Sequence, residues 1–478
     1  MSSMTPPRLL QLAQKSLLGN EALAILSLDQ LPREMFPVLF VEAFNSWLLD
    51  ILKAMVRVWP FEVLPLGALM KNPQVDILKA VLDGLDMKYT QKSDCRRGKL
   101  HVLDLRDDGL NFWNVWAKSM DDACSSEPNM RRQPVEHKGP KSALMVIANV
   151  SLTATTPDAF LTHLLQWVKE RASLVHLCCH KLKILANLIC SMSHMLESLE
   201  FGCIEELEVC CDWQPSGLAK FAPYLGRMSS LHKLSLVNLS GSLLVTIEEM
   251  MESLFQFASQ FAKLPHLRSL HIRSLYFVYN HLDQLLRCLK SPLEDFSVTA
   301  CLLSEADINY LSQCPCLSEI KYLALRVVKL THISPEPLRV LLERVAPTLM
   351  TLDLMGCEIT DSQLNAILPA LSHCYQLTSL SFYGNRLSMA MMEKLVEHTG
   401  NLSALIYELY PAPLESYDTQ GIAHGGRFSH LCTELMGILE RIREPKQVLF
   451  STDPCWKCAE RMVFGLNHPN QCHCYQLD

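Results

Sequence analysis

The sequence predicts an α/β leucine-rich repeat solenoid, a horseshoe-like array of strands and helices, with a helical cap at its N-terminus. A pattern of three apolar residues, Leu-x-x-Leu-x-Leu with substitutions of similar size, recurs along most of the chain. The second half of each repeat carries apolar residues at three- and four-residue spacing, which is typical of a helix. Each repeat therefore supplies one strand and one helix, and we expect the strands to line the concave face.

The repeat is clearest in the second half of the chain. Five copies, spaced 26, 27, 29 and 28 residues apart, begin at Leu267, Leu293, Ile320, Leu349 and Leu377. The last two apolar residues of each copy are two positions apart, so both point inward from a strand. Three residues further on, Cys301, Cys357 and Asn385 are expected to turn inward and to satisfy backbone groups of the loop.

The pattern changes toward both ends of the chain. We expect a helical cap over residues 1–95, a first degenerate repeat with a polar insertion over 96–170, repeats over 171–410, and a C-terminal cap with a cysteine-rich tail over 411–478. A cap is expected because an open array would expose its apolar end. Within this cap, two amphipathic helices are predicted, over residues 9–29 and 31–58. The last copy of the repeat is predicted to be Leu402-x-x-Leu405-x-Tyr407.

Composition and charge exclude several classes of function. The formal charge of −7 is spread along the chain without a basic stripe, so we expect no direct nucleic-acid binding. No apolar run reaches the ~18 residues that a membrane span needs, and the N-terminus lacks the pattern of a signal peptide. Many of the 19 cysteines occupy apolar repeat positions, which favours a reducing compartment: the cytoplasm, the nucleus or both.

The chain shows none of the common catalytic motifs. It contains no Walker loop, no Gly-x-Ser-x-Gly and no His-Glu-x-x-His, so we expect no catalytic residues and no enzyme. Near the C-terminus, Cys455-x-x-Cys458 has the spacing of a zinc half-site, and Cys472-x-Cys474 could complete four thiolates. Free thiols or a redox pair are the alternatives. The sequence thus predicts no cofactor apart from this candidate structural zinc.

Blocks of specific residues are distributed along almost the whole chain. They include Pro7-Arg8-Leu9-Leu10-Gln11-Leu12-Ala13, Leu31-Pro32-Arg33-Glu34-Met35-Phe36-Pro37 and Tyr410-Pro411-Ala412-Pro413-Leu414-Glu415-Ser416-Tyr417. With these blocks the chain resembles the PRAME family. The resemblance implies a leucine-rich repeat protein that acts as substrate receptor of a cullin-2 ubiquitin ligase, with Elongin B and Elongin C as partners. It also implies links to repression of retinoic acid receptor signalling, to proliferation and differentiation, and to negative regulation of apoptosis.

Two N-terminal stretches can be compared with the motifs of such an adaptor. An Elongin C box has a leucine, a small residue four positions later and an apolar residue four after that, and Leu9, Ala13 and Leu17 fit. This spacing puts all three on one stripe of a helix, which could lie in a groove of its partner. The chain departs from the box in two ways: alanine stands where cysteine is commoner, and Arg8 precedes the leucine.

The second stretch has the pattern of a cullin-2 box. Its matching residues are Leu31, Pro32, Met35 and Leu39. For both stretches, the alternative is a helical cap that packs its own leucines inward. Two functions without a ligase also stay open: a transcriptional corepressor or scaffold, and a stand-alone inhibitor in the manner of ribonuclease inhibitor.

A protein substrate is expected on the concave strand face. The outward-pointing candidates there are His271, Arg273, Arg326, Asp353, Ser381 and Tyr383. Arginine and tyrosine are enriched at binding hot spots, so Arg326 and Tyr383 are the first choices. Leu338-x-x-Leu341-Leu342 matches a nuclear-receptor motif and makes a receptor a further candidate partner, although these leucines fall where a repeat helix should bury them.

Overall fold

The computed structural model divides the chain into two compact units. The N-terminal unit comprises Met1–Leu182 and Cys190–Ile204, and the C-terminal unit comprises Lys183–Ile189 and Glu205–Asp478. The structure describes residues 9–70, 72, 74–90, 98–107, 112–113, 144–153, 158–185, 196–197, 199–210, 215–238, 246–275, 278–455 and 457–465. Most of the predicted polar insertion, residues 107–145, lies outside the described residues.

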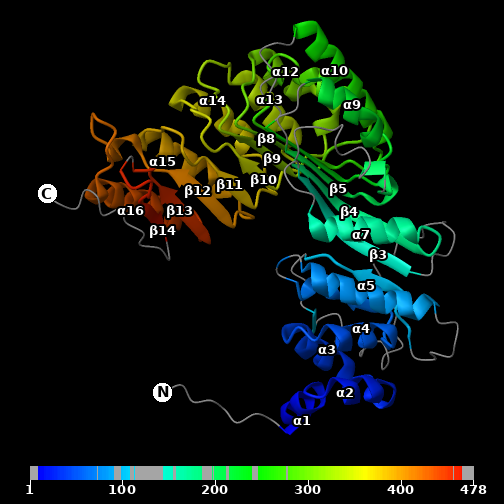
Figure 1. The fold of residues 1–478 in the computed structure, drawn as a ribbon. Helices are drawn as coiled ribbons and strands as arrows, with labels where there is room; N and C mark the ends of the chain where they lie inside the picture. Colours follow the sequence, from blue (N-terminus) through cyan, green and yellow to red (C-terminus); the bar gives the residue numbers. More distant parts are fainter. Residues whose placement is uncertain are drawn as a thin grey trace. The chain divides into compact units, whose positions relative to one another are not determined.

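The N-terminal unit begins with helices (Figure 1). They are α1 (Leu9–Leu18), α2 (Glu21–Ser27), η1 (Leu28–Gln30), α3 (Met35–Asn45), α4 (Leu49–Arg57), η2 (Leu66–Ala68) and α5 (Val75–Thr90). Each of the two predicted cap helices is in fact broken into two. The first break follows Gly19, because the Asn20 side chain accepts a hydrogen bond from the N–H of Leu23 and starts α2.

The second break, after Asn45, is a Schellman motif. Trp47 takes a positive φ of 55°, its N–H donates to Phe44 O, and the Leu48 N–H donates to Ala43 O. Beyond α4, the fully buried Trp59 packs edge-on against Phe40, with ring centroids 5.1 Å apart. The cap therefore has an aromatic core of its own.

Strands also begin earlier in the chain than the sequence suggested. In the N-terminal unit, β1 (Val63–Pro65), β2 (Val102–Asp104) and β3 (Leu144–Thr153) pair in parallel. They are followed by α7 (Ala159–Glu170), β4 (Val175–Leu185) and the 3-10 helix η3 (Phe201–Cys203). Because β1 is only three residues long, the surrounding helical pattern hid it within the expected cap.

The C-terminal unit alternates strands and helices in the manner of leucine-rich repeats (Figure 1). Its strands are β5 (Glu206–Cys210), β6 (Lys233–Val237), β7 (Ser269–Arg273), β8 (Asp295–Thr299), β9 (Tyr322–Arg326), β10 (Thr351–Asp353), β11 (Ser379–Ser381), β12 (Tyr407–Pro411), β13 (Gln447–Ser451) and β14 (Val463–Gly465). Neighbours from β5 to β13 pair in parallel, and β14 pairs with β13 antiparallel.

The helices of this unit cover one side of the strand layer. They are α9 (Pro215–Leu225), α10 (Ile247–Ser259), α11 (Leu282–Leu286), α12 (Glu305–Gln313), α13 (Glu336–Val345), α14 (Asp361–Leu371), α15 (Met389–His398) and α16 (Gly425–Ile442). Short 3-10 helices are η4 (Gln260–Lys263), η6 (Pro315–Leu317), η7 (Thr399–Asn401) and η8 (Leu414–Ser416). The predicted α/β leucine-rich repeat class is confirmed. None of the described helices is long and apolar enough to cross a membrane.

The inward-turning side chains after the strands also behave as predicted. The Asn385 amide donates to Leu354 O at 2.9 Å and to Phe382 O at 2.7 Å, and its oxygen accepts from the N–H of Ile359 at 3.0 Å. Cys357 and Cys301 are buried at the equivalent turns, where their thiols bond backbone groups. These side chains satisfy the buried backbone groups of the loops.

The last predicted copy of the repeat was wrong by three residues. Leu380 pairs with Glu408, and the buried residues of the copy are Leu405, Glu408 and Tyr410, whereas Tyr407 is exposed. The apolar pattern misled because a glutamate occupies an inward position that holds Leu380 in β11 and Val448 in β13. Arg443 from the end of α16 and the Tyr410 hydroxyl both hydrogen-bond to the Glu408 carboxylate, which is what allows it to be buried.

Candidate protein-binding surfaces

The candidate substrate-binding residues lie on what we call the strand face. It consists of the side chains of β5–β13 that point away from the helices. The strand register places His271, Asp353 and Ser381 in one row across this face, and Arg273 and Arg326 in the next row. Tyr383 follows β11 by two residues. The structure thus brings five of the six predicted residues onto one ordered layer.

Arg326 is the centre of a polar cluster on the strand face. Its Nε donates to Asp353 Oδ2 at 2.6 Å, and a terminal nitrogen donates to the Tyr322 hydroxyl at 2.6 Å. Asp353 also accepts from the N–H of Met355 at 3.0 Å. These bonds fix the guanidinium while leaving it about one-third exposed. An arginine held in this way can bind a partner with less loss of side-chain entropy.

A second cluster surrounds Asp295 on β8. His271 Nε2 lies 2.8 Å from Asp295 Oδ2, and the Ser269 hydroxyl donates to the same oxygen at 2.8 Å. Burial raises the pKa of Asp295, but the hydrogen bonds and positive charge of His271, with the Ser269 bond, outweigh it and hold the pKa below its usual range. The acidic side chains of both clusters therefore have hydrogen-bond partners within the chain before any partner binds.

The other candidate residues differ in how far a partner could reach them. Arg273 is exposed, whereas Ser381 is buried. The Tyr383 ring lies under the guanidinium of Arg461, 4.5 Å from the ring centroid, and its hydroxyl is 3.4 Å from Thr452 O. Tyr383 is therefore already in contact with the chain that leads into β14.

Sequence reasoning missed several residues of the strand face. Tyr322 and Asp295 belong to the clusters above, and Tyr407 and Leu409 are exposed large side chains on β12. Alternation along each strand would have identified Tyr322 and Asp295, because each directly precedes an inward-pointing residue and therefore points outward. Tyr407 could not have been found in this way, since its repeat had been placed out of register.

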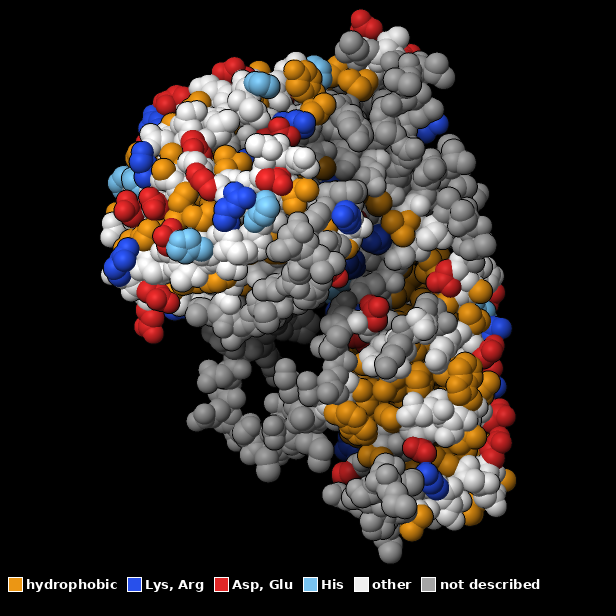
Figure 2. All heavy atoms as spheres, turned by 90° about the vertical axis from the view of Figure 1, so that its left-hand side faces the viewer, with side chains coloured by type: hydrophobic (Ala, Val, Ile, Leu, Met, Phe, Trp, Pro, Cys, Tyr) orange, Lys and Arg blue, Asp and Glu red, His pale blue; other side chains and the backbone are white. Residues whose placement is uncertain are grey.

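The candidate Elongin C box lies on α1, in the N-terminal unit. Leu9 begins this helix, Ala13 is exposed and Leu17 is half-buried. Leu12 in α1 and Leu23 and Leu26 in α2 are large apolar side chains that are more than half exposed. On the face seen in Figure 2, hydrophobic side chains also gather over the N-terminal unit, whereas charged and polar side chains are interspersed over the C-terminal unit.

The residues of the candidate cullin-2 box are divided between surface and core. Pro32 is exposed, Leu31 and Met35 are half-buried, and Leu39 is fully buried within α3. Leu39 therefore packs in the cap, as the alternative for this stretch expected. The first three residues are the part that a partner could touch.

The cysteine-rich tail is only partly described. Cys455 and Cys458 lie on the connection between β13 and β14, where the Cys455 N–H donates to Glu460 O at 2.7 Å and its carbonyl accepts from the N–H of Ala459 at 2.8 Å. Cys472 and Cys474 lie outside the described residues. Zinc at these four cysteines stays a prediction.

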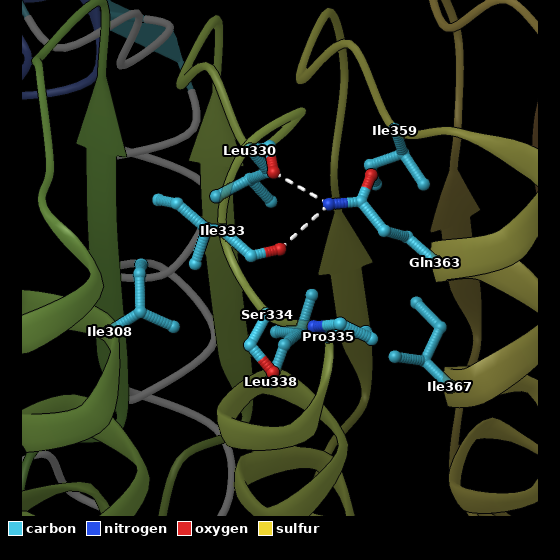
Figure 3. A pocket seen from close by; sticks show the side chains of 9 residues that line it. All are labelled: Ile308, Leu330, Ile333, Ser334, Pro335, Leu338, Ile359, Gln363 and Ile367. Carbon is cyan, nitrogen blue, oxygen red and sulfur yellow. Dashed lines mark hydrogen bonds between the residues drawn. The ribbon is translucent and has the colours of Figure 1, made fainter.

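The receptor-type motif lies in the core of the repeats. Leu338, Leu341 and Leu342 of α13 are each at most 5% exposed, so they cannot dock on a receptor without unfolding the helix. Figure 3 shows Leu338 beside an apolar cavity that is also lined by Gln363, which donates to Leu330 O and Ile333 O. The cavity has a volume of about 20 Å³, enough for about one water molecule and too small for a ligand.

Comparison with known proteins identifies the family. Residues 6–113 match the PRAME N-terminal domain, and residues 144–474 match the PRAME C-terminal domain. The chain belongs to the PRAME family. Membership of this family of non-enzymatic leucine-rich repeat proteins confirms the prediction that the chain is not itself an enzyme.

Human PRAME family proteins resemble this chain along its full length. PRAME family member 12 of Homo sapiens is 49% identical over 475 residues, which cover 99% of this chain and 98% of the relative. PRAME family member 8 of Homo sapiens is 48% identical over 477 residues, with 99% and 100% covered. One chain in the crystal structure of the yeast Rad7 and Elc1 complex aligns with this PRAME family protein at 17% sequence identity. The alignment covers 54% of this protein and 77% of the matched chain. Its TM-score of 0.28 is too low to support an argument about fold or partners.

Proposed function

We propose that this PRAME family protein is the substrate-recognition adaptor of a ubiquitin ligase that contains cullin-2, Elongin B and Elongin C. The observation that carries the proposal is the candidate Elongin C box on α1, where the central Ala13 is exposed. A small exposed residue at this position lets a partner approach the helix closely. This is the geometry that helix-in-groove recognition needs.

Exposed leucines next to the box support the same proposal. Leu12 is 52% exposed, Leu23 is 53% exposed and Leu26 is 77% exposed. α1 packs against α2, so these leucines lie on neighbouring helices. Apolar side chains that gather on a surface favour a contact with another protein, because each of them gains free energy when it is removed from water.

The remaining parts of the adaptor follow from the arrangement of the chain. Pro32, with the accessible parts of Leu31 and Met35, would contact cullin-2, while Leu39 holds α3 in the cap. The strand face would bind the protein substrate, with Arg326 as its anchor. Such an adaptor would work in the cytoplasm, the nucleus or both, and would act on differentiation, proliferation and apoptosis through the substrate that it selects.

Binding to a purified Elongin B–Elongin C complex tests the proposal. We expect the full chain to bind, and Ala13→Glu to weaken binding at least tenfold, since it places a charge at the centre of the interface. Ala390→Glu is the matched control, because Ala390 is also an exposed alanine near the start of a helix, α15. The proposal fails if the wild-type chain does not bind the complex, or if Ala13→Glu binds as tightly as Ala390→Glu.

A further inference from the structure

A cluster of metal-ligating side chains lies in the N-terminal unit. His176 and Cys178 belong to β4, and Cys203 ends the 3-10 helix η3. One ligand atom from each of these three residues lies within 4.8 Å of the other two. His176 and Cys178 are two positions apart on a strand, so they share one face of it, and Cys203 lies close to both of them.

The spacing of the cluster fits a tetrahedral zinc ion. His176 Nε2 lies 3.7 Å from Cys203 Sγ. Zinc–nitrogen and zinc–sulfur bonds of about 2.0 and 2.3 Å at a tetrahedral angle separate the two ligand atoms by roughly 3.5 Å. Cys178 and Cys203 are 3% and 4% exposed, so a bound ion would be shielded from solvent on their side.

The other nitrogen of His176 has the partner that metal-binding histidines usually have. His176 Nδ1 lies 2.7 Å from the carboxylate of Glu200. A carboxylate at this nitrogen fixes the tautomer and the orientation of the ring, and it makes the opposite nitrogen a better ligand. Glu200 thus directs Nε2 toward the two sulfur atoms, and acts as a positioning residue.

We propose that His176, Cys178 and Cys203 bind a structural zinc ion that ties η3 to β4. Zinc binding would displace the two thiol protons and leave two thiolates and a neutral imidazole on the metal. The fourth coordination position is left to a ligand that these three residues do not supply. The ion would clamp together two segments whose ligands are 27 residues apart in the chain.

The first test measures metal content in the full chain, expressed with zinc and purified without chelators. All variants carry Cys455→Ser, Cys458→Ser, Cys472→Ser and Cys474→Ser, so that the cysteines of the C-terminal tail cannot hold zinc. We expect about one zinc ion per chain in this background, its loss in Cys203→Ser, and its retention in the control Cys288→Ser, which removes a partly exposed cysteine of the C-terminal unit. Absence of zinc in the background protein, or its retention in Cys203→Ser, would overturn the proposal.

The second test does not depend on the stability of a cysteine variant. Glu200→Gln changes a side chain that is 54% exposed, so it should fold normally. Zinc affinity, measured by competition with a chromophoric chelator, should fall 10- to 100-fold, as for other carboxylates behind a ligating histidine. Glu197→Gln, a change at another glutamate shortly before η3, serves as the control. Equal affinity in the Glu200→Gln and Glu197→Gln proteins would contradict the assignment of His176 as an oriented ligand.

Discussion

The repeats of the C-terminal unit and the helices α1 and α2 of the N-terminal unit use leucine in opposite ways. The inward leucines of the repeats, such as Leu352 and Leu380, are at most 1% exposed, whereas Leu12, Leu23 and Leu26 are more than half exposed. The repeats also pair the charges on their surface, as Arg326 does with Asp353. Leucine therefore stabilises the fold in the repeats, whereas on α1 and α2 part of it is exposed to solvent.

The largest effect is expected where the repeats bury a charge in place of a leucine. Glu408 is fully buried, and its partner Arg443 has a side chain only 10% exposed. Arg443→Met leaves an unpaired carboxylate in the core, so it should lower the free energy of unfolding by about 3–5 kcal/mol. Urea unfolding followed by circular dichroism would measure this change.

The double variant Glu408→Leu/Arg443→Met is the control for this prediction. It puts at position 408 the leucine that β11 has at this inward position, next to Val448 of β13. Since Glu408 Oε1 has no hydrogen-bond partner among the described residues, the ion pair is incompletely satisfied, and the double variant should be as stable as wild type or more stable. A double variant as unstable as Arg443→Met would show that the pair stabilises the repeat as a unit.

The next effect compares the two kinds of leucine directly. Leu380→Ala should cost about 2–5 kcal/mol of unfolding free energy, because it opens a cavity in the core. Leu26→Ala should change stability by less than about 0.5 kcal/mol, because the side chain already lies in water. Leu26→Ala should instead weaken binding to the Elongin complex. A large loss of stability in Leu26→Ala, without loss of binding, would assign α2 to the core.

The smallest effect concerns the paired charges of the strand face. The pKa of Asp295 lies below its usual range, so the folded state favours the charged carboxylate. The resulting stabilisation is present above the unfolded-state pKa of about 3.9, and is lost as the pH falls through the lower folded-state pKa. Asp295→Asn should therefore cost up to about 1 kcal/mol at neutral pH and progressively less in acid.

Unfolding by urea at pH 7 and at pH 3 would measure this difference. Asp50→Asn, which changes an exposed aspartate at the start of α4, serves as the control. A destabilisation by Asp295→Asn that is the same at both pH values would exclude the hydrogen-bonded carboxylate as its cause.

Much of the fold could be predicted from the sequence because the repeat is periodic. Leucines at a fixed spacing identified strands β7–β11 of the C-terminal unit and the helices between them, and the residue three positions after the pattern identified Asn385 as a loop-satisfying side chain. The pattern failed where one residue departed from it. Glu408 has no apolar character, and its burial depends on contacts with Arg443 and the Tyr410 hydroxyl. The last predicted strand was therefore placed three residues too early.

The candidate binding surfaces also could be predicted only in part from the sequence. Alternation along the strands placed His271, Arg326 and Asp353 on one face, but it could not show that each charge already has a partner. Helical spacing placed Ala13 and Leu17 on one stripe of α1, and the burial of Leu39 in α3 could be learned only from the packed cap. A spacing rule tells which side chains share a face, and packing decides whether that face is covered.

The repeat, the class of fold and the resemblance to the PRAME family could be predicted from the residues alone, because they depend on residues that are near one another in the chain. The register of β12 and the proximity of His176 to Cys203 became visible only in the folded chain. Both depend on contacts between segments more than 25 residues apart. Such contacts are set by how whole elements pack, and no local pattern of residues specifies them.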